Sequence, residues 1–262
     1  MAVSTLRSAL RPRSYVRVAG PDAADYLQRM VSNDVAGLPV GGSCDALLLT
    51  PKARVIAPLK VWRRDDDDFL LLTEPELGER VRAELLRMRF AAKAEIELER
   101  HVSRLVFGGD AEGIPNADYG EPAVEVLDAG PVGEELAEEE LELLRILART
   151  PRHGLEIDER VLPAEAGLTE THVDFGKGCY PGQEPVARLH YRGHANRGLR
   201  LLALAEPPER DAELEHEGKA VGRVTSAARS PEHGAVALAY VRVEVPEDAP
   251  LSVGDRPARQ LH

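Results

Sequence analysis

Alternating apolar and polar residues predict a strand at residues 14–20, SYVRVAG, near the start of the chain. The stretch GPDAADYLQRMVSND that follows has acidic residues in its first turn and predicts a helix that ends at Asn33 and Asp34. Three apolar runs then predict strands at 44–49, 54–63 and 68–73, and the aspartates between the last two predict a hairpin loop. The segment PELGERVRAELLRMRF predicts a second helix, and AEIELERHVSRLVFGG predicts two more strands.

The second half of the chain changes character at about Gly193. A helix is predicted over about 134–148, where leucines at helical spacing form one stripe, and a proline ends it. Beyond Gly193 every apolar run is strand-like and is separated from the next by proline or glycine, which predicts a small β-barrel at 193–262. Mixed segments in residues 1–192 followed by an all-β part are typical of the α+β class.

Composition and charge narrow the function classes. The 262 residues carry a formal net charge of −12 without a visible basic stripe, which argues against direct nucleic-acid binding. There is no uncharged apolar run of about 18 residues, so no membrane span is expected. The first segment, MAVSTLRSALRPRSY, lacks the apolar region of a secretory signal, so a cytoplasmic protein is expected.

The chain has two cysteines, Cys44 and Cys179, which are too few for a disulfide scaffold or a four-ligand zinc site. No histidine pair stands on a recognisable helix at metal-ligand spacing, so no metal site is predicted. Cys44 enters an apolar run and is expected to pack as a small hydrophobe. Cys179 lies in KGCYPGQEPVAR, residues 177–188, whose glycines and proline favour an exposed bend. The lysine and the arginine at the ends of this segment would favour a thiolate there.

The residues alone leave the role of this segment open. Cys179 is either a reactive or ligating thiol or a packed, inert one. Gln183 and Glu184 either orient a bound group or pair with neighbouring cations, and Arg188 either binds an anion or pairs with Glu184. A cysteine hydrolase is a further alternative, whose base would be one of three histidines, His172, His190 and His194.

The same segment also resembles a family signature. It carries all seven fixed positions of the pattern Lys-Gly-Cys-Tyr-x-Gly-Gln-Glu, which is typical of the YgfZ family, relatives of the glycine-cleavage T-protein. Three other segments resemble the same family in order and spacing: GPDAADYLQRMVSNDVAGLPVGG, LRILARTPRHGLEID and GRVTSAARSPEHGAVALAYVR. The similarity therefore covers nearly the whole chain.

The resemblance implies a T-protein-like ring, in which two interleaved α+β subdomains in residues 1–192 surround a central cleft and the barrel at 193–262 closes the ring. It implies binding of tetrahydrofolate or a related folate. It also implies support for iron–sulfur cluster assembly or repair, with iron–sulfur client or assembly proteins as partners and without conventional enzymatic turnover. Cys179 matches the cysteine that the family needs. The residues expected around the ligand are Lys177, Tyr180, Gln183, Glu184, Arg188, Asn33 and Asp34.

Two places depart from the T-protein pattern. Ala57 and Pro58 stand where the T-protein has an acidic pair that assists proton transfer. A tetrahydrofolate-dependent aminomethyltransferase or demethylase is therefore the alternative function. Leu147 stands where an acidic residue would accept hydrogen bonds from the pterin ring, so Glu142 or Glu184 would have to replace it.

Overall fold

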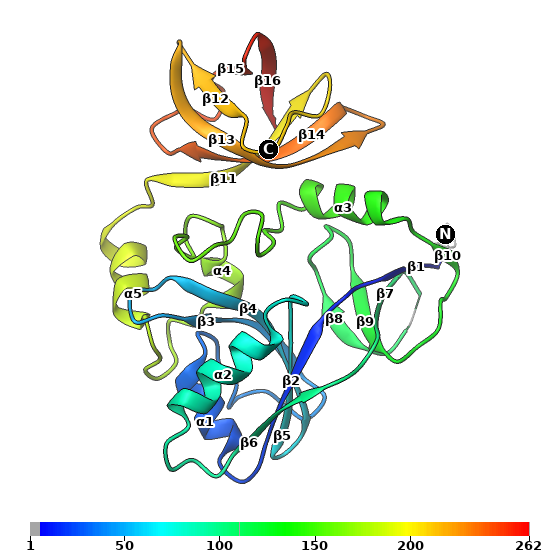
Figure 1. Ribbon diagram of the computed structural model, residues 1–262, viewed down its shortest axis with the longest axis vertical. Helices are drawn as coiled ribbons and strands as arrows, with labels where there is room; N and C mark the ends of the chain where they lie inside the picture. The colour runs from blue at the N-terminus through cyan, green and yellow to red at the C-terminus, as the bar shows by residue number, and fades with distance from the viewer. Residues whose placement is uncertain (1–5, 110, 262) are drawn as a thin grey trace.

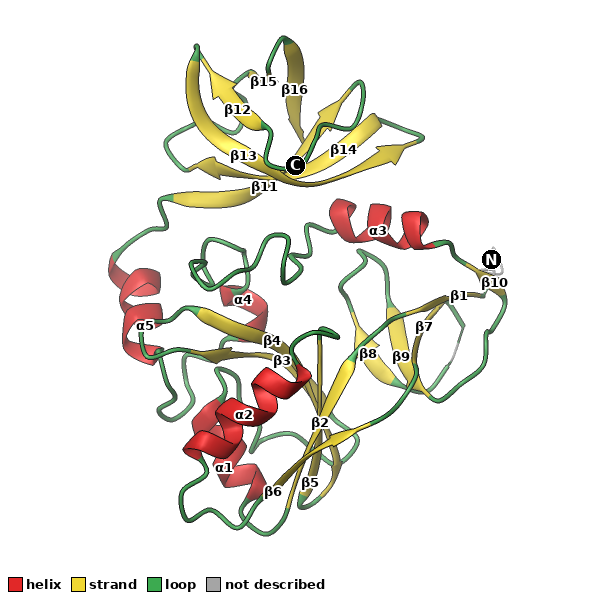
Figure 2. Ribbon diagram, viewed as in Figure 1, coloured by secondary structure: helices red, strands yellow, loops and turns green. Residues whose placement is uncertain are grey.

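The structure, a computed structural model, describes residues 6–109 and 111–261 and contains two five-stranded sheets and a closed barrel. The barrel lies at one end of the molecule, and the two sheets lie at the other end, beyond helix α3 (Glu138–Leu147) (Figure 1). Strands predominate over short helices throughout (Figure 2), which confirms the predicted α+β class.

The first sheet has the strand order β3-β4-β5-β2-β6. Its strands are β2 (Ser14–Ala19), β3 (Ser43–Leu49), β4 (Val55–Asp65), β5 (Asp68–Thr73) and β6 (Glu95–Glu99). Helices α1 (Ala23–Met30) and α2 (Gly78–Met88) cover one face, where apolar side chains such as Leu27, Leu71 and Leu85 are fully buried. The strands predicted at 44–49, 54–63 and 68–73 match β3, β4 and β5 within two residues, because each contains an apolar run that is buried on both faces of the sheet.

The second sheet has the strand order β10-β1-β7-β9-β8. Its strands are β1 (Arg7–Leu10), β7 (Ser103–Phe107), β8 (Ile114–Asn116), β9 (Ala123–Leu127) and β10 (Glu134–Glu135). Because β1 precedes the whole first sheet in sequence and pairs antiparallel with β7, which follows it, the first sheet is inserted within the second. The two α+β units are therefore interleaved, as predicted. The sequence pattern does not predict β1, β8, β9 and β10, of which β8 and β10 have three and two residues and are too short to show a period.

The C-terminal barrel closes in the order β11-β14-β13-β12-β15-β16. Its strands are β11 (Arg197–Leu204), β12 (Glu213–His216), β13 (Lys219–Ser230), β14 (Gly234–Arg242), β15 (Leu251–Val253) and β16 (Arg256–Leu261). Leu202, Val224 and Val241 are fully buried in its interior. The predicted barrel is confirmed, and α5 (Gln183–Arg192) precedes its first strand.

Three helices follow the second sheet. The helix predicted over 134–148 is shorter than expected, because residues 134–135 pair with β1 and α3 starts at Glu138. The side chain of Glu140 accepts a hydrogen bond from the backbone N–H of Ala137, which defines this start. The sequence pattern does not predict α4 (Thr169–His172) or the full length of α5. In the described part of the chain, no helix is long and apolar enough to cross a membrane.

A buried polar cluster of Arg145, Glu156 and Ser226 joins α3 to the barrel. Arg145 Nη1 lies 3.1 Å from Glu156 Oε2, and Arg145 Nη2 donates to Ser226 Oγ on β13 at 2.8 Å. Ser226 Oγ in turn donates to Glu156 Oε1 at 2.5 Å. The hydroxyl of Tyr240 on β14 donates to the backbone carbonyl of Glu156 at 3.0 Å. Glu156 lies between α3 and the barrel, so this cluster joins them, together with the apolar contacts of Ile146 with Val236 and Leu238.

Arg145→Met should destabilise the protein by about 3–5 kcal/mol, because it leaves the carboxylate of Glu156 buried without its cation. The free energy of unfolding from urea denaturation at pH 7 measures this. Arg160→Met is the control, since Arg160 pairs with Asp158 at the exposed surface and should show no measurable change. Equal free energies of unfolding for the two variants would contradict the conclusion that this cluster joins α3 to the barrel.

Candidate functional site

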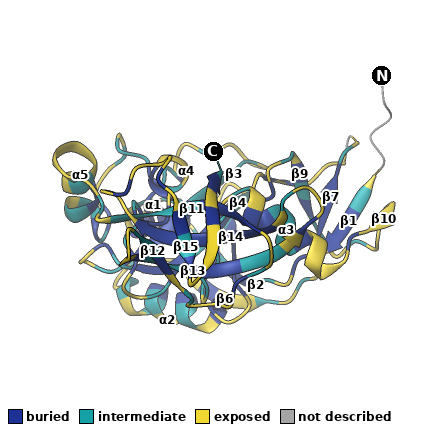
Figure 3. Cartoon of the chain, turned by 90° about the horizontal axis from the view of Figure 1, so that it is seen from above, coloured by how far each residue is buried: buried dark blue, intermediate teal, exposed yellow. Residues whose placement is uncertain are grey.

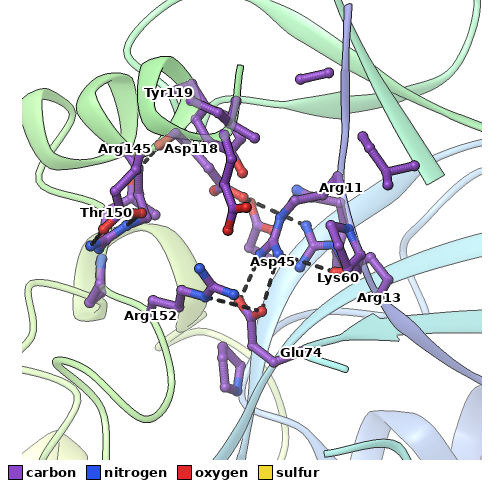
Figure 4. A pocket seen from close by; sticks show the side chains of 18 of the residues that line it. Arg11, Arg13, Asp45, Lys60, Glu74, Asp118, Tyr119, Arg145, Thr150 and Arg152 are labelled. Carbon is purple, nitrogen blue, oxygen red and sulfur yellow. Dashed lines mark hydrogen bonds and ion pairs between the residues drawn. The ribbon is translucent and has the colours of Figure 1, made fainter. Parts of the chain in front are cut away.

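A cavity of about 320 Å³ lies between the two sheets, α3 and residues 150–152 (Figure 4). Its volume is near the lower end of the range for small-molecule sites, roughly 300–1,000 Å³. Several different segments of the chain contribute side chains to it, as expected for a cleft at the meeting point of two sheets. The principal polar side chains that line it are those of Arg11, Arg13, Asp45, Lys60, Glu74, Asp118, Tyr119, Glu142, Arg145 and Arg152.

Two arginines between β1 and β2 form ion pairs at one side of the cavity. Arg11 Nη2 lies 2.7 Å from Glu74 Oε1, and Arg13 Nε lies 2.8 Å from Glu125 Oε1. Burial by itself raises the pKa of Glu125, but Arg13 more than offsets this and brings the pKa down to about 2. The pKa of Glu74 is also below its ordinary value, because Arg11 outweighs the effect of burial. Both carboxylates are therefore ionised at neutral pH.

Other groups of the cavity retain hydrogen-bonding capacity for a ligand. Lys60 Nζ donates to Asp45 Oδ1 at 2.5 Å, which uses one of its three donors. The guanidinium of Arg152 makes no hydrogen bond within the described residues and approaches Glu74 only to 3.8 Å. Asp118 lines the same space with a carboxylate that is three-quarters buried. The cavity thus combines cationic donors with carboxylate acceptors, which suits a small molecule with both N–H donors and an anionic group.

Lys177 of the signature does not line this cavity. Its ammonium donates to the backbone carbonyls of Gln28 at 2.7 Å, Val31 at 2.6 Å and Asn33 at 2.7 Å. Burial lowers the pKa of Lys177 to about 8, so the side chain is mostly charged at pH 7. An ammonium has three donors, and all three are used here. Lys177, expected beside the ligand, therefore keeps no donor for one in this conformation.

Asn33 and Asp34, also expected at the ligand, lie outside the cavity lining. The prediction that the helix ends at these two residues is wrong, because α1 ends at Met30 and Val31 is already extended. The side-chain amide of Asn33 donates to the backbone carbonyl of Asp45 at 2.7 Å. Asp34 Oδ1 accepts a hydrogen bond from Gln28 Nε2 at 2.9 Å. Both side chains thus connect the end of α1 to its surroundings. Their ligand role stays a prediction.

Cys179 is exposed and lies on the bend that precedes α5. The bend closes at Gly182, where φ is +83° and an added Cβ would meet the carbonyl oxygen of Thr50 at 2.6 Å. Only glycine satisfies both conditions, so the sequence at this position determines how the bend contacts the β3–β4 turn. The predicted exposed bend is present, and α5 lies at the exposed edge of the molecule (Figure 3).

The remaining signature residues lie around this bend, and none of them lines the central cavity. Tyr180 is buried, with its ring 5.4 Å from the ammonium of the signature lysine. Gln183 is half-buried, whereas Glu184 and Arg188 are exposed on α5. No ion pair joins Glu184 to Arg188 within the described residues, so the pairing alternative does not hold in this conformation. The structure thus brings the signature together but places it apart from the cavity.

The three histidines considered as a hydrolase base lie in different surroundings. His172 lines the cavity, and burial lowers its pKa. The ring of His190 stacks on Phe175 with the centroids 4.0 Å apart, and His194 is exposed. Within the described residues no hydrogen bond joins any of them to Cys179. The cysteine hydrolase alternative therefore gains no support.

The positions that depart from the T-protein pattern lie partly inside and partly outside the cavity lining. Ala57 is fully buried and Pro58 lines the cavity, so neither supplies an ionisable group. Leu147 is 37% exposed and lies outside the cavity lining. Of the two carboxylates considered as its replacement, Glu142 lines the cavity and Glu184 does not.

Sequence reasoning missed most of the charged residues of the cavity. Lys60 interrupts the apolar run of β4, and Arg145 lies among the apolar residues of α3. A charge inside a predicted core pattern is the signal that could have identified both, because unpaired charges are rarely buried. Arg11 and Glu74 carry no such signal, since they lie in connections outside the strands.

Comparison with known proteins first defines the class. Residues 195–260 match the family described as CAF17, C-terminal beta-barrel domain. A solved structure, the glycine cleavage system aminomethyltransferase T from Bartonella henselae, superposes with a TM-score of 0.85 at 21% identity, covering 98% of this chain and 85% of that one. The chain therefore has the T-protein fold, as predicted.

Proteins that are similar to nearly the whole chain indicate a narrower class of relatives within this fold. The iron-sulfur cluster assembly factor IBA57 homolog, mitochondrial, of Pyricularia oryzae is 27% identical and covers 97% of this chain and 75% of its own length. The tRNA-modifying protein YgfZ of Serratia proteamaculans is 26% identical and covers 97% of this chain and 89% of its own length. These similarities confirm the resemblance to the YgfZ family that residues 177–188 predict.

The two cysteines should differ strongly in reactivity. Burial raises the pKa of Cys44 to about 12, whereas Cys179 is exposed. With a thiol reagent at pH 8, Cys179 should be modified first and Cys44 at least ~100-fold more slowly, because the thiolate is the reactive form. Peptide mapping by mass spectrometry over a time course measures both rates. Comparable rates for the two thiols would show that the exposed bend is not the conformation in solution.

Proposed function

We propose that this protein is a YgfZ-type accessory factor that supports the assembly or repair of iron–sulfur clusters through Cys179. The observation that carries the proposal is the exposure of this thiol on a bend that is held at both ends. Thiolate is a soft ligand that suits iron and its clusters. One cysteine cannot hold a cluster alone, so an iron–sulfur client or assembly protein supplies the other ligands. An exposed thiol is accessible to such a partner.

The names of the relatives support the same role. One is named an iron-sulfur cluster assembly factor, and others are named tRNA-modifying proteins. The proposal therefore includes support for iron–sulfur enzymes that modify tRNA, without direct contact between this acidic protein and nucleic acid. The cytoplasmic location expected from the sequence is also part of the proposal, although the fungal relative is named as mitochondrial.

The central cavity is proposed to bind tetrahydrofolate or a related folate. The N–H donors of the pterin edge need carboxylate acceptors, and Asp118 and Glu142 line the cavity with carboxylates. The carboxylates of the glutamate tail need cations, which Lys60 and Arg152 supply. When bound, the folate supplies one-carbon chemistry, and the residues of this chain bind and orient it. No observation favours aminomethyl transfer, since Ala57 and Pro58 cannot carry a proton.

Cys179→Ser should abolish support for an iron–sulfur client enzyme in a host that lacks the native protein. Client activity should fall to the level of the deletion strain, because a hydroxyl is a poor ligand for iron and a poor nucleophile. Assay of a radical-SAM tRNA-modifying enzyme or an iron–sulfur dehydratase gives the measurement. Cys44→Ser should keep normal activity. If the Cys179→Ser variant supports the client normally, the proposed role of this thiol is wrong.

Tetrahydrofolate should bind to the protein with a measurable heat in calorimetry, accompanied by a change in Trp62 fluorescence. Asp118→Asn should weaken binding by about tenfold or more, because a hydrogen bond to a charged acceptor contributes roughly 1.5–3 kcal/mol. Asp66→Asn changes an exposed carboxylate of the β4–β5 hairpin and should bind as the parent does. Absence of binding by the parent protein would remove the folate from the proposal and leave the role of Cys179 intact.

A further inference from the structure

We propose that Lys177 is a positioning residue, which ties the glycine-rich bend to the end of α1 and so holds the Cys179 thiol where a partner protein meets it. The biological meaning of this tie rests on the proposed function of Cys179. The tie itself is a property of the fold and is measurable without any iron–sulfur client. It gives Lys177 a role other than the ligand contact expected from the family resemblance.

The three acceptors of Lys177 are suited to an ammonium. The last carbonyls of a helix have no partner within the helix, and they lie at the negative end of its dipole. Gln28 lies in the last turn of α1, Val31 caps it, and Asn33 follows two residues later. Lys177 donates one hydrogen bond to each of these carbonyls, across 149, 146 and 144 residues of sequence respectively. A single side chain therefore satisfies one carbonyl of the last helical turn and two carbonyls of the segment that follows it, and fastens the bend to both.

The part of the bend next to Cys179 needs such a tie, because packing around Gly178 does not hold it. Gly176, Gly178 and Gly182 lie within seven residues, and glycine loses more conformational entropy on ordering than any other residue. A Cβ built at Gly178 would meet no heavy atom within 4 Å, so packing does not hold this part of the bend. On the other side of Cys179, Tyr180 is buried in an apolar cluster with Val186. The thiol thus lies between one polar and one apolar anchor.

The segment before the bend is fastened to the same helix end. Ser32 Oγ donates to the backbone carbonyl of His172 at 2.6 Å, and the backbone N–H of Asp174 donates to the carbonyl of Ser32 at 3.0 Å. The chain therefore leaves α4 already attached to the end of α1, and Lys177 continues this attachment to within two residues of Cys179. Because the three carbonyls converge on one point, the tetrahedral donors of lysine fit them better than the planar fork of arginine.

A spin label on Cys179 tests the tie directly. In a Cys44→Ser background, a nitroxide attached to Cys179 should give a restricted EPR spectrum, and Lys177→Met should give a severalfold more mobile one. Lys177→Gln keeps two donors and should give intermediate mobility, and it replaces the methionine variant if that variant does not fold. Lys52→Met is the matched control, because Lys52 is exposed on the neighbouring β3–β4 turn and pairs with no described residue. Its label should move as in the parent.

The outcomes separate the tie from the function. A label as restricted in Lys177→Met as in the parent overturns the proposal. If the label is mobile in Lys177→Met but the unlabelled Lys177→Met protein supports the client normally, the statement that Cys179 must be held in place is wrong. The expected result is a mobile label, client activity lost, and an unchanged rate of Cys179 modification by a small thiol reagent. If Cys179→Ser leaves the client unaffected, the proposed function fails, whereas the EPR comparison still decides whether Lys177 holds the bend.

Discussion

The arrangement of the molecule depends on a crossed pair of buried ion pairs at the segment Arg11–Pro12–Arg13. Arg11 follows β1 of the second sheet and pairs with Glu74 at the end of β5 in the first sheet. Arg13 precedes β2 of the first sheet and pairs with Glu125 on β9 of the second. Each arginine thus binds the sheet to which it does not belong.

These crossed pairs explain why a cavity persists between the sheets. Buried charges must be paired and hydrogen-bonded, because an unpaired one is strongly unfavourable, and replacing a buried pair with apolar residues is often neutral or even stabilising. We therefore interpret the pairs as determinants of arrangement more than of stability. They join the two sheets beside the cavity, and Arg11, Arg13 and Glu74 belong to its lining. The polar lining that results is the part of the molecule best suited to a charged small ligand.

The cavity and the exposed thiol are separate sites, and β3 contributes to the connection between them. Asp45 of β3 lines the cavity, and its backbone carbonyl accepts a hydrogen bond from Asn33. The carbonyl of Asn33 in turn accepts from Lys177, two residues before Cys179. Two hydrogen bonds that meet at Asn33 therefore connect the wall of the cavity to the base of the bend. In this fold the cavity and the exposed thiol are therefore connected through the segment that follows α1.

Local patterns in the sequence determined much of this protein. Apolar runs located β3, β4 and β5, the change at Gly193 located the barrel, and the signature at 177–188 located the exposed cysteine and the family resemblance. Each of these patterns involves residues that are near one another in the sequence, so it can be recognised without the tertiary structure. The cavity could not be predicted in this way, because its charged residues come from connections and strands far apart in sequence.

Only the tertiary structure decided what the individual polar side chains do. Lys177 and Asn33, for which the family resemblance predicts a ligand contact, donate in this structure to the backbone carbonyls of Val31 and Asp45. Of the two carboxylates considered as replacements for an acidic residue at position 147, Glu142 lines the cavity and Glu184 does not. The physical reason is that a polar side chain takes its role from the partners it meets in space, and for Lys177 those partners are 144 or more residues away.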